Sequence, residues 1–250
     1  MHRLVVVLVA LVSLTPAIGS LPHQPAQPTG LDGYREAETL VFSEQGSTSE
    51  VRALLEDARR ALQGESNRAL RSYWIARTHL LLATHYNQRE QQGDAERQAE
   101  LGFAAVEDAL DRDGEFSEGL RVQADLHAQM MFARGMFYMV RFGSEARRQA
   151  MRAMELDPDN IRARITVAGF YLNAPRVAGG DPEEGVAILE QALSTNPSNE
   201  SLSFLILGLL AQTYIDDGDE STAESYLRRA AEIYPTSPWI AELHDRIASS

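Results

Sequence analysis

The sequence contains neither cysteine nor lysine. Without cysteine, the chain can form no disulfide, no thiolate metal site, no cysteine nucleophile and no acylated lipoprotein anchor. Without lysine, its 23 strongly basic residues are all arginine. Arginine forms bidentate pairs with carboxylates. We therefore expect ion pairs between helices, although a codon-usage bias alone would also produce this composition.

Positive charge is scarce, because the 23 arginines are outnumbered by 36 acidic residues and the formal net charge is −13. Nucleic acids and anionic membranes bind clustered positive charge, so we expect neither as a partner. Hydrophobic residues make up 44% of the chain and charged residues 24%. These fractions are typical of a globular protein.

The amino terminus carries an apolar run that follows a basic residue. Arg3 precedes the apolar run from Leu4 to Leu14, and small residues follow at Ala17 and Gly19. This order is typical of a signal peptide. We predict a cleaved signal peptide over residues 1–19, with an uncleaved anchor as the alternative, and a periplasmic or secreted protein that is not a lipoprotein. Residues 20–33, rich in proline and glycine, are predicted to be a flexible linker, and no later segment should span a membrane.

The alternating pattern of β-strands is missing after residue 33. Small or apolar residues recur instead at offsets of zero, four and seven, with a proline or glycine at offset twelve. Such steps place residues on one face of a helix, and a proline ends the helix. The copies are Gly102, Val106, Ala109 and Gly114; Ala146, Ala150, Ala153 and Pro158; Gly185, Leu189, Ala192 and Pro197; Ala223, Leu227, Ala230 and Pro235; and a fainter copy at Leu54, Ala58 and Ala61.

A second motif precedes three of these copies. It consists of an apolar residue, an alanine and, one turn later, a tyrosine. A helix with this motif, a turn and a helix ending at proline make a helical hairpin, and such hairpins bury their faces by stacking. The motif occurs at Leu82, Ala83 and Tyr86; Val167, Ala168 and Tyr171; and Leu210, Ala211 and Tyr214.

These residues resemble the tetratricopeptide repeat (TPR) family, most closely over residues 210–235. The resemblance implies an all-α fold of stacked antiparallel hairpins that form a right-handed superhelix. We assign residues 34–250 to this domain, with repeats at about 71–114, 115–158, 159–197 and 198–235 and a capping helix at 237–250. Residues 116–142 are ambiguous and could form one long or kinked helix.

The family binds a protein or peptide in a concave groove lined by the first helix of each hairpin. Arginine and side-chain amides can bind the backbone and the charged ends of an extended peptide. The groove positions of the family fall on Arg77, Thr84, Asn87, Gln88, Arg162, Asn173, Gln212 and Asp216.

Residues for catalysis or metal binding are not assembled in the sequence. His79 and His85 lie six positions apart on a predicted helix and therefore face different sides. No catalytic or phosphate-binding motif occurs. The acidic clusters at 111–115 and 216–220 lack the full calcium-loop pattern and are interpreted as helix turns. We therefore expect no enzyme activity, no metal and no cofactor.

The most distinctive turn is the loop over residues 174–181. Gly179 and Gly180 free the backbone, and Asp181 can cap the next helix. Pro175 followed by Gly-Gly-Asp is also similar to the T-component of TRAP transporters, periplasmic helical-repeat proteins thought to partner a solute-binding protein. That resemblance implies an alternative role as an accessory subunit of a solute transport system, although the lipid-anchor cysteine of that family is missing.

Two apolar stretches, Met130–Phe142 and Leu202–Leu210, are richer than one helix face requires. Core packing, self-association and an apolar binding channel all remain open for them. The leading interpretation is an exported, non-catalytic scaffold that binds a protein or peptide partner in its groove. A homo-oligomer is left open.

Overall fold

The computed structural model describes residues 28–195 and 200–249. The predicted signal peptide and most of the predicted linker lie outside this range. Within it, every regular element is a helix, so the all-α prediction is confirmed. The helices are α1 (Asp32–Phe42), α2 (Thr48–Ala61), α3 (Arg68–Gln88), α4 (Gln92–Leu110), α5 (Ser117–Arg134), α6 (Met136–Leu156), α7 (Ile161–Asn173), α8 (Pro182–Thr195), α9 (Glu200–Asp217), α10 (Glu220–Ile233) and α11 (Pro238–Ala248), with short 3-10 turns at Leu62–Gly64 and Arg176–Ala178.

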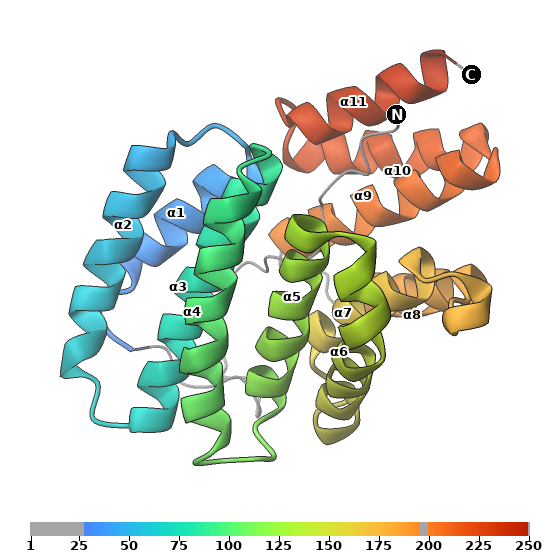
Figure 1. Cartoon of the computed structure of the whole chain (residues 1–250). Coiled ribbons are helices and arrows are strands. Elements are labelled where there is room, and N and C mark those ends of the chain that lie inside the picture. Colours follow the sequence, from blue (N-terminus) through green and yellow to red (C-terminus); the bar gives the residue numbers. More distant parts are fainter. Residues whose placement is uncertain (1–27, 196–199, 250) are drawn as a thin grey trace.

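Consecutive helices pair into hairpins, α1 with α2 through α9 with α10 (Figure 1), and α11 packs on the last pair. Side-chain caps fix several of the helix starts. The Oδ1 atoms of Asn67 and Asn160 accept the N–H groups of Leu70 and Ala163 at 3.1 and 3.0 Å. Such caps satisfy backbone donors that the first turn of a helix leaves unpaired.

The second helix of each hairpin forms an outer layer whose inward stripe is made of small residues. All residues at offsets zero, four and seven of the four clear copies are buried. At Gly185 a Cβ atom would lie 2.8 Å from the side chain of Leu172 on α7, so the two helices touch closely there. The fainter fifth copy was predicted in the wrong register, because α2 buries Val51, Leu55 and Ala58 at the same offsets, three residues earlier than expected.

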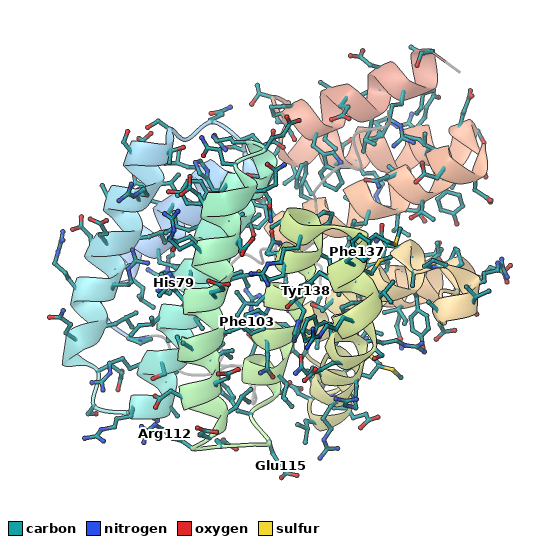
Figure 2. All side chains as sticks on the ribbon, in the orientation of Figure 1. His79, Phe103, Arg112, Glu115, Phe137 and Tyr138 are labelled. Atoms are coloured by element: carbon teal, nitrogen blue, oxygen red, sulfur yellow. The ribbon has the colours of Figure 1, made fainter. Side chains whose placement is uncertain are left out.

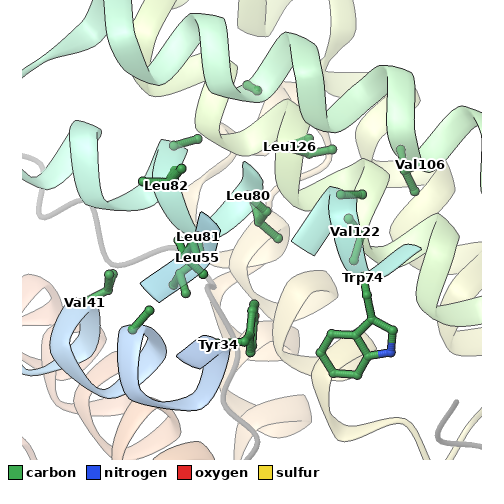
Figure 3. Packing of buried hydrophobic residues seen from close by; sticks show 14 of the residues in the cluster. Tyr34, Val41, Leu55, Trp74, Leu80, Leu81, Leu82, Val106, Val122 and Leu126 are labelled. Atoms are coloured by element: carbon green, nitrogen blue, oxygen red, sulfur yellow. The ribbon is translucent and has the colours of Figure 1, made fainter. Parts of the chain in front are cut away.

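The first helices of the hairpins form an inner layer and are buried on nearly all sides. In α3 every residue from Ser72 to Asn87 except Ile75 and His79 is buried. Figure 3 shows one part of this core, where Trp74 and Leu81 of α3 lie near Tyr34 of α1 and Leu55 of α2. None of the described helices is long and apolar enough to cross a membrane.

Residues 116–142 do not form one helix. Gly135, with φ of +72°, separates α5 from α6, a backbone conformation that glycine adopts without strain. The apolar stretch Met130–Phe142 is therefore divided: Met130 is buried at 2% exposure, whereas Phe137 is 93% exposed.

The ends of the array are held by specific contacts. The last residues of the predicted linker belong to the fold, because Leu31 is buried and α1 begins at Asp32. The amide of Gln45, after α1, donates to the hydroxyl of Thr236, before α11, at 3.3 Å. The first and last turns of the array therefore meet.

We predict that Gly208→Ala loosens the capping helix α11. A methyl group at Gly208 would overlap the ring of Trp239, whereas Gly93 in α4 has no heavy atom within 4 Å of its Cβ position. Both substitutions gain the helix propensity of alanine, so Gly93→Ala is the matched control. We expect Gly208→Ala to be less stable than Gly93→Ala by about 1–3 kcal/mol in urea unfolding. Equal stabilities would show that Trp239 does not pack tightly on α9.

Candidate functional site: an arginine row on the inner helices

Three successive inner helices carry an arginine at the same repeat position. Arg77 of α3, Arg121 of α5 and Arg162 of α7 each lie five residues before the apolar residue of the second motif, at Leu82, Leu126 and Val167. We call these three residues the arginine row. Sequence analysis selected Arg77 and Arg162 but missed Arg121, because α5 has His127 where the other two helices have alanine. The spacing alone would have found it.

Arg77, at one end of the row, has both a carboxylate and aromatic contacts. Its Nη2 atom lies 3.2 Å from Oε1 of Glu38 on α1. Its guanidinium carbon also lies 4.5 Å from the ring centre of Trp74 and 5.0 Å from that of Tyr34. These are cation–π distances.

Arg121 is held by two carboxylates from its own helix. Its Nε and Nη2 atoms donate to the two oxygens of Glu118 at 2.9 and 3.1 Å, a bidentate pair. Its Nη1 atom donates to Oδ2 of Asp125.

Hydrogen bonds to the same carboxylates join three hairpins. Tyr73 of α3 donates its hydroxyl to Glu118 at 2.6 Å. Asn160, at the start of α7, donates to Glu118 at 2.7 Å, and Thr166 of α7 donates to Asp125 at 2.9 Å. The network therefore fixes the spacing of α3, α5 and α7 along the inner layer.

Burial shifts the pKa values of the charged groups in this network by different amounts and in different directions. The side chains of the arginine row are at most 4% exposed. Burial alone would raise the pKa of Glu118, but Arg121 and Arg162 hold that pKa well below its usual range. Burial raises the pKa of Asp125 to about 7 despite the nearby Arg121. Burial, with Arg77 nearby, lowers the pKa of Arg162.

Three buried guanidinium groups share one repeat position of the inner layer, beside the buried carboxyl groups of Glu38, Glu118 and Asp125. The charge of Arg162 is opposed both by burial and by Arg77. An anionic group placed beside the row would favour the charged form of Arg162. In a buried setting this gain would be larger than at the surface.

Most of the other predicted groove residues make contacts within the fold. Asn87 is buried and donates to the backbone and side-chain oxygens of Gln129 at 3.1 and 2.9 Å. Gln88 donates to the carbonyl of Val41, and Asp216 pairs with Arg246. Thr84 and Asn173 donate to carbonyls of their own helices, those of Leu80 and Gly169, and the Oε1 atom of half-buried Gln212 has no partner among the described residues.

The loop over residues 174–181 is explained by its backbone. Gly179 has φ of +87°, and a Cβ atom at Gly180 would overlap the carbonyl of Ala174. The N–H group of Asp181 donates to the carbonyl of Tyr171 at 3.0 Å, and its carboxylate accepts the N–H group of Glu184 at 3.3 Å. Asp181 thus closes the loop and caps α8, while the carbonyl of Pro175 accepts the N–H groups of Ala178 and Gly180.

Comparisons with known proteins agree with this architecture. Residues 176–247 match a model of the tetratricopeptide repeat family. The structure of TTC0263, a thermophilic TPR protein from Thermus thermophilus, aligns with 88% of this chain and 98% of its own at a TM-score of 0.53 and 18% identity. This protein has the tetratricopeptide repeat fold. A second structure, MamA, aligns with 75% of this chain and 92% of its own at a TM-score of 0.37 and 16% identity. No curated protein matches.

We predict that Asp125→Asn changes how stability depends on pH. Between the ordinary aspartate pKa of about 4 and the folded value of about 7, the folded state holds a proton that the unfolded state has lost. Stability from this group is therefore lost as the pH rises through that window. Asparagine carries no such proton, so the stability of Asp125→Asn relative to the unmodified protein should rise from about pH 5 to about pH 8 in urea unfolding.

Asp159→Asn, at an exposed aspartate, is the control for this experiment, and its stability difference should stay constant. A constant difference for Asp125→Asn as well would contradict the raised pKa.

Proposed function

We propose that this protein is an exported, non-catalytic scaffold that binds an anionic segment of a partner protein at its arginine row. TPR domains bind protein partners. The observation that carries the proposal is the placement of Arg77, Arg121 and Arg162 at one repeat position of three consecutive inner helices. A row with this regular spacing suits an extended chain, which presents acidic side chains or a terminal carboxylate along its length.

The distribution of charge supports this choice of partner. The protein as a whole carries a net charge of −13, yet its inner layer holds three buried arginines at one repeat position. Glu38 and Glu118 neutralise part of this charge, whereas Asp125, with a pKa of about 7, is partly protonated near neutral pH. Holding Arg162 charged in a buried site costs free energy, as its lowered pKa indicates. Proteins keep such costs at binding sites, where a ligand offsets them.

Access to the row involves α1. Glu38 of α1 is a counter-ion of Arg77, and Tyr34 of α1 covers the same guanidinium. The α1–α2 hairpin is the first of the array, and a terminal repeat packs on a neighbour on one side only. A partner carboxylate can therefore replace Glu38 beside Arg77 if α1 moves.

We predict that Arg162→Gln weakens partner binding in a protein that still folds. The tagged mature protein would be used to capture partners from the exported fraction of its own organism, with Arg164→Gln, on another side of α7, as the control. We expect capture to fall about tenfold, as for the loss of a binding hot spot. The free energy of unfolding should fall, because Arg162 helps keep the buried carboxyl group of Glu118 charged, so capture is measured where circular dichroism shows that both variants are folded.

Two results would contradict this proposal. Capture that persists in Arg162→Gln would exclude the row as the binding site. Loss of capture by a variant that is unfolded under the conditions of capture would assign Arg162 a structural role. If the captured partner is a solute-binding protein, the result would favour the transport-subunit alternative, which stays a prediction.

Export is tested separately with the amino-terminal sequence. Residues 1–33 would be fused to an alkaline phosphatase that is active only outside the cytoplasm. We expect activity with the natural sequence and with Leu8→Ile, and its loss with Leu8→Arg, because a charge interrupts the apolar run. Activity in Leu8→Arg, or none in the natural fusion, would overturn export.

A further inference from the structure

The first turns of α6 expose large apolar side chains. Phe137 is 93% exposed, Val140 77% and Met136 66%. Their neighbour Tyr138 is buried, and its hydroxyl lies 2.9 Å from Nδ1 of His127 on α5. Figure 2 shows Phe137 and Tyr138 on different sides of α6. One face of the helix therefore packs in the core, and the other presents apolar groups to solvent without a structural need.

A second exposed apolar side chain is held by the loop between α7 and α8. Val177 is fully exposed, at 101%. The loop around it is closed by backbone hydrogen bonds, among them Ala178 N–H to the carbonyl of Pro175 at 2.8 Å and Asp181 N–H to that of Tyr171 at 3.0 Å. Val177 is therefore displayed by a fixed backbone rather than by a loose one.

The helix and the loop are neighbours. The guanidinium of Arg147 on α6 packs on Gly179 of the loop and lies 5.3 Å from the ring centre of Tyr171. Phe137 and Val140 lie on neighbouring turns of one face of α6, and Arg147 lies two turns after Val140 on the same face. We call this face together with Val177 and Arg176 of the loop the α6–loop surface.

Positive charge borders the apolar groups of this surface. Arg141, Arg147 and Arg148 of α6 and Arg176 of the loop form no ion pair with any carboxylate in residues 28–195 and 200–249. Glu145 is half-buried and lies one turn from Arg141 and from Arg148 on α6, at the edge of this face that meets His127 and Tyr138. The surface is therefore basic and apolar on a chain whose net charge is −13.

We propose that the α6–loop surface is a second docking site, which binds an acidic amphipathic segment of another protein. Apolar side chains of the segment would cover Phe137, Val140 and Val177, and its carboxylates would pair with the bordering arginines. This inference goes beyond the proposed function, because the surface belongs to α6 of the outer layer and to a loop, and shares no residue with the arginine row.

Charge argues against the other occupants. Two copies that met through this same surface would bring their arginines together, which costs free energy. An anionic membrane would attract the surface but repel the rest of a chain with a net charge of −13. A short acidic segment would contact only the basic α6–loop surface, so the acidic remainder of the chain would not repel it strongly.

The experiment uses two labelled synthetic peptides, each about 18 residues long and designed as an amphipathic helix. Both carry the same leucine face, but the polar face is glutamate in one and lysine in the other. Fluorescence anisotropy would measure their binding to the full mature protein and to two double variants, Phe137→Ser with Val140→Ser, and Arg141→Glu with Arg148→Glu. Arg228→Glu, at an exposed arginine of α10, is the matched control.

We expect the glutamate peptide to bind, and each double variant to weaken it about tenfold or more. The lysine peptide should not bind, and Arg228→Glu and Arg162→Gln should bind the glutamate peptide as the unmodified protein does. The last result would separate this site from the arginine row. No binding of the glutamate peptide, equal binding of both peptides, or unchanged binding in the double variants would overturn the proposal.

Two further measurements test the other occupants. If sedimentation velocity shows an oligomer that the Phe137 and Val140 substitutions dissociate, the occupant of the surface is a second copy of the chain and the proposal is wrong. If the protein floats with vesicles of three parts phosphatidylethanolamine and one part phosphatidylglycerol, and the same variant does not, the occupant of the surface is a membrane and the proposal is wrong. A monomer that does not float, together with peptide binding, supports the proposal.

Discussion

Close contact through small side chains is the constraint on which the rest of the structure depends. The outer helices touch the inner layer at positions such as Gly185, Ala146 and Ala150, where larger residues would push the layers apart. Within the inner layer that they cover, Tyr73 of α3 reaches Glu118 of α5 at 2.6 Å and Thr166 of α7 reaches Asp125 of α5 at 2.9 Å. The buried charge network therefore joins inner helices that the small residues of the outer helices enclose.

The repeat pattern was sufficient to predict the hairpins, because small residues at helical spacing have one meaning and the prolines fix where helices end. The pattern failed where the same residues fitted two registers or two backbone conformations equally well. Ala58 fits a copy that begins at Leu54 and one that begins at Val51, and only packing selects Val51. Gly135 ends α5 while Gly102 lies inside α4, and the difference is a backbone angle that the sequence does not display.

The candidate site was predictable only in part, for a related reason. Inner helices such as α3 are buried on nearly all sides, so periodicity does not separate a groove-facing residue from one that faces a neighbouring helix. Asn87 illustrates this, because its amide bonds to Gln129 of α5 and serves the packing of two hairpins. Arg121 was missed because α5 has His127 in place of the alanine of the motif, although Glu118 and Asp125 lie three and four residues from Arg121 on the same helix.

Each of the two proposed surfaces has a feature that is unfavourable for stability, a buried charge at one and exposed apolar side chains at the other. At the arginine row, Arg162 remains charged where burial opposes it, and hydrogen bonds across three hairpins hold the geometry in place. At the α6–loop surface, Phe137 lies in solvent beside arginines that pair with no described carboxylate. A buried charge suits selective recognition, because desolvated charge discriminates strongly between ligands. Exposed arginines suit rapid association, because their charge attracts an acidic partner before the two proteins touch. The same acidic chain can therefore attract a partner on its outer face and select a segment of it on the inner one.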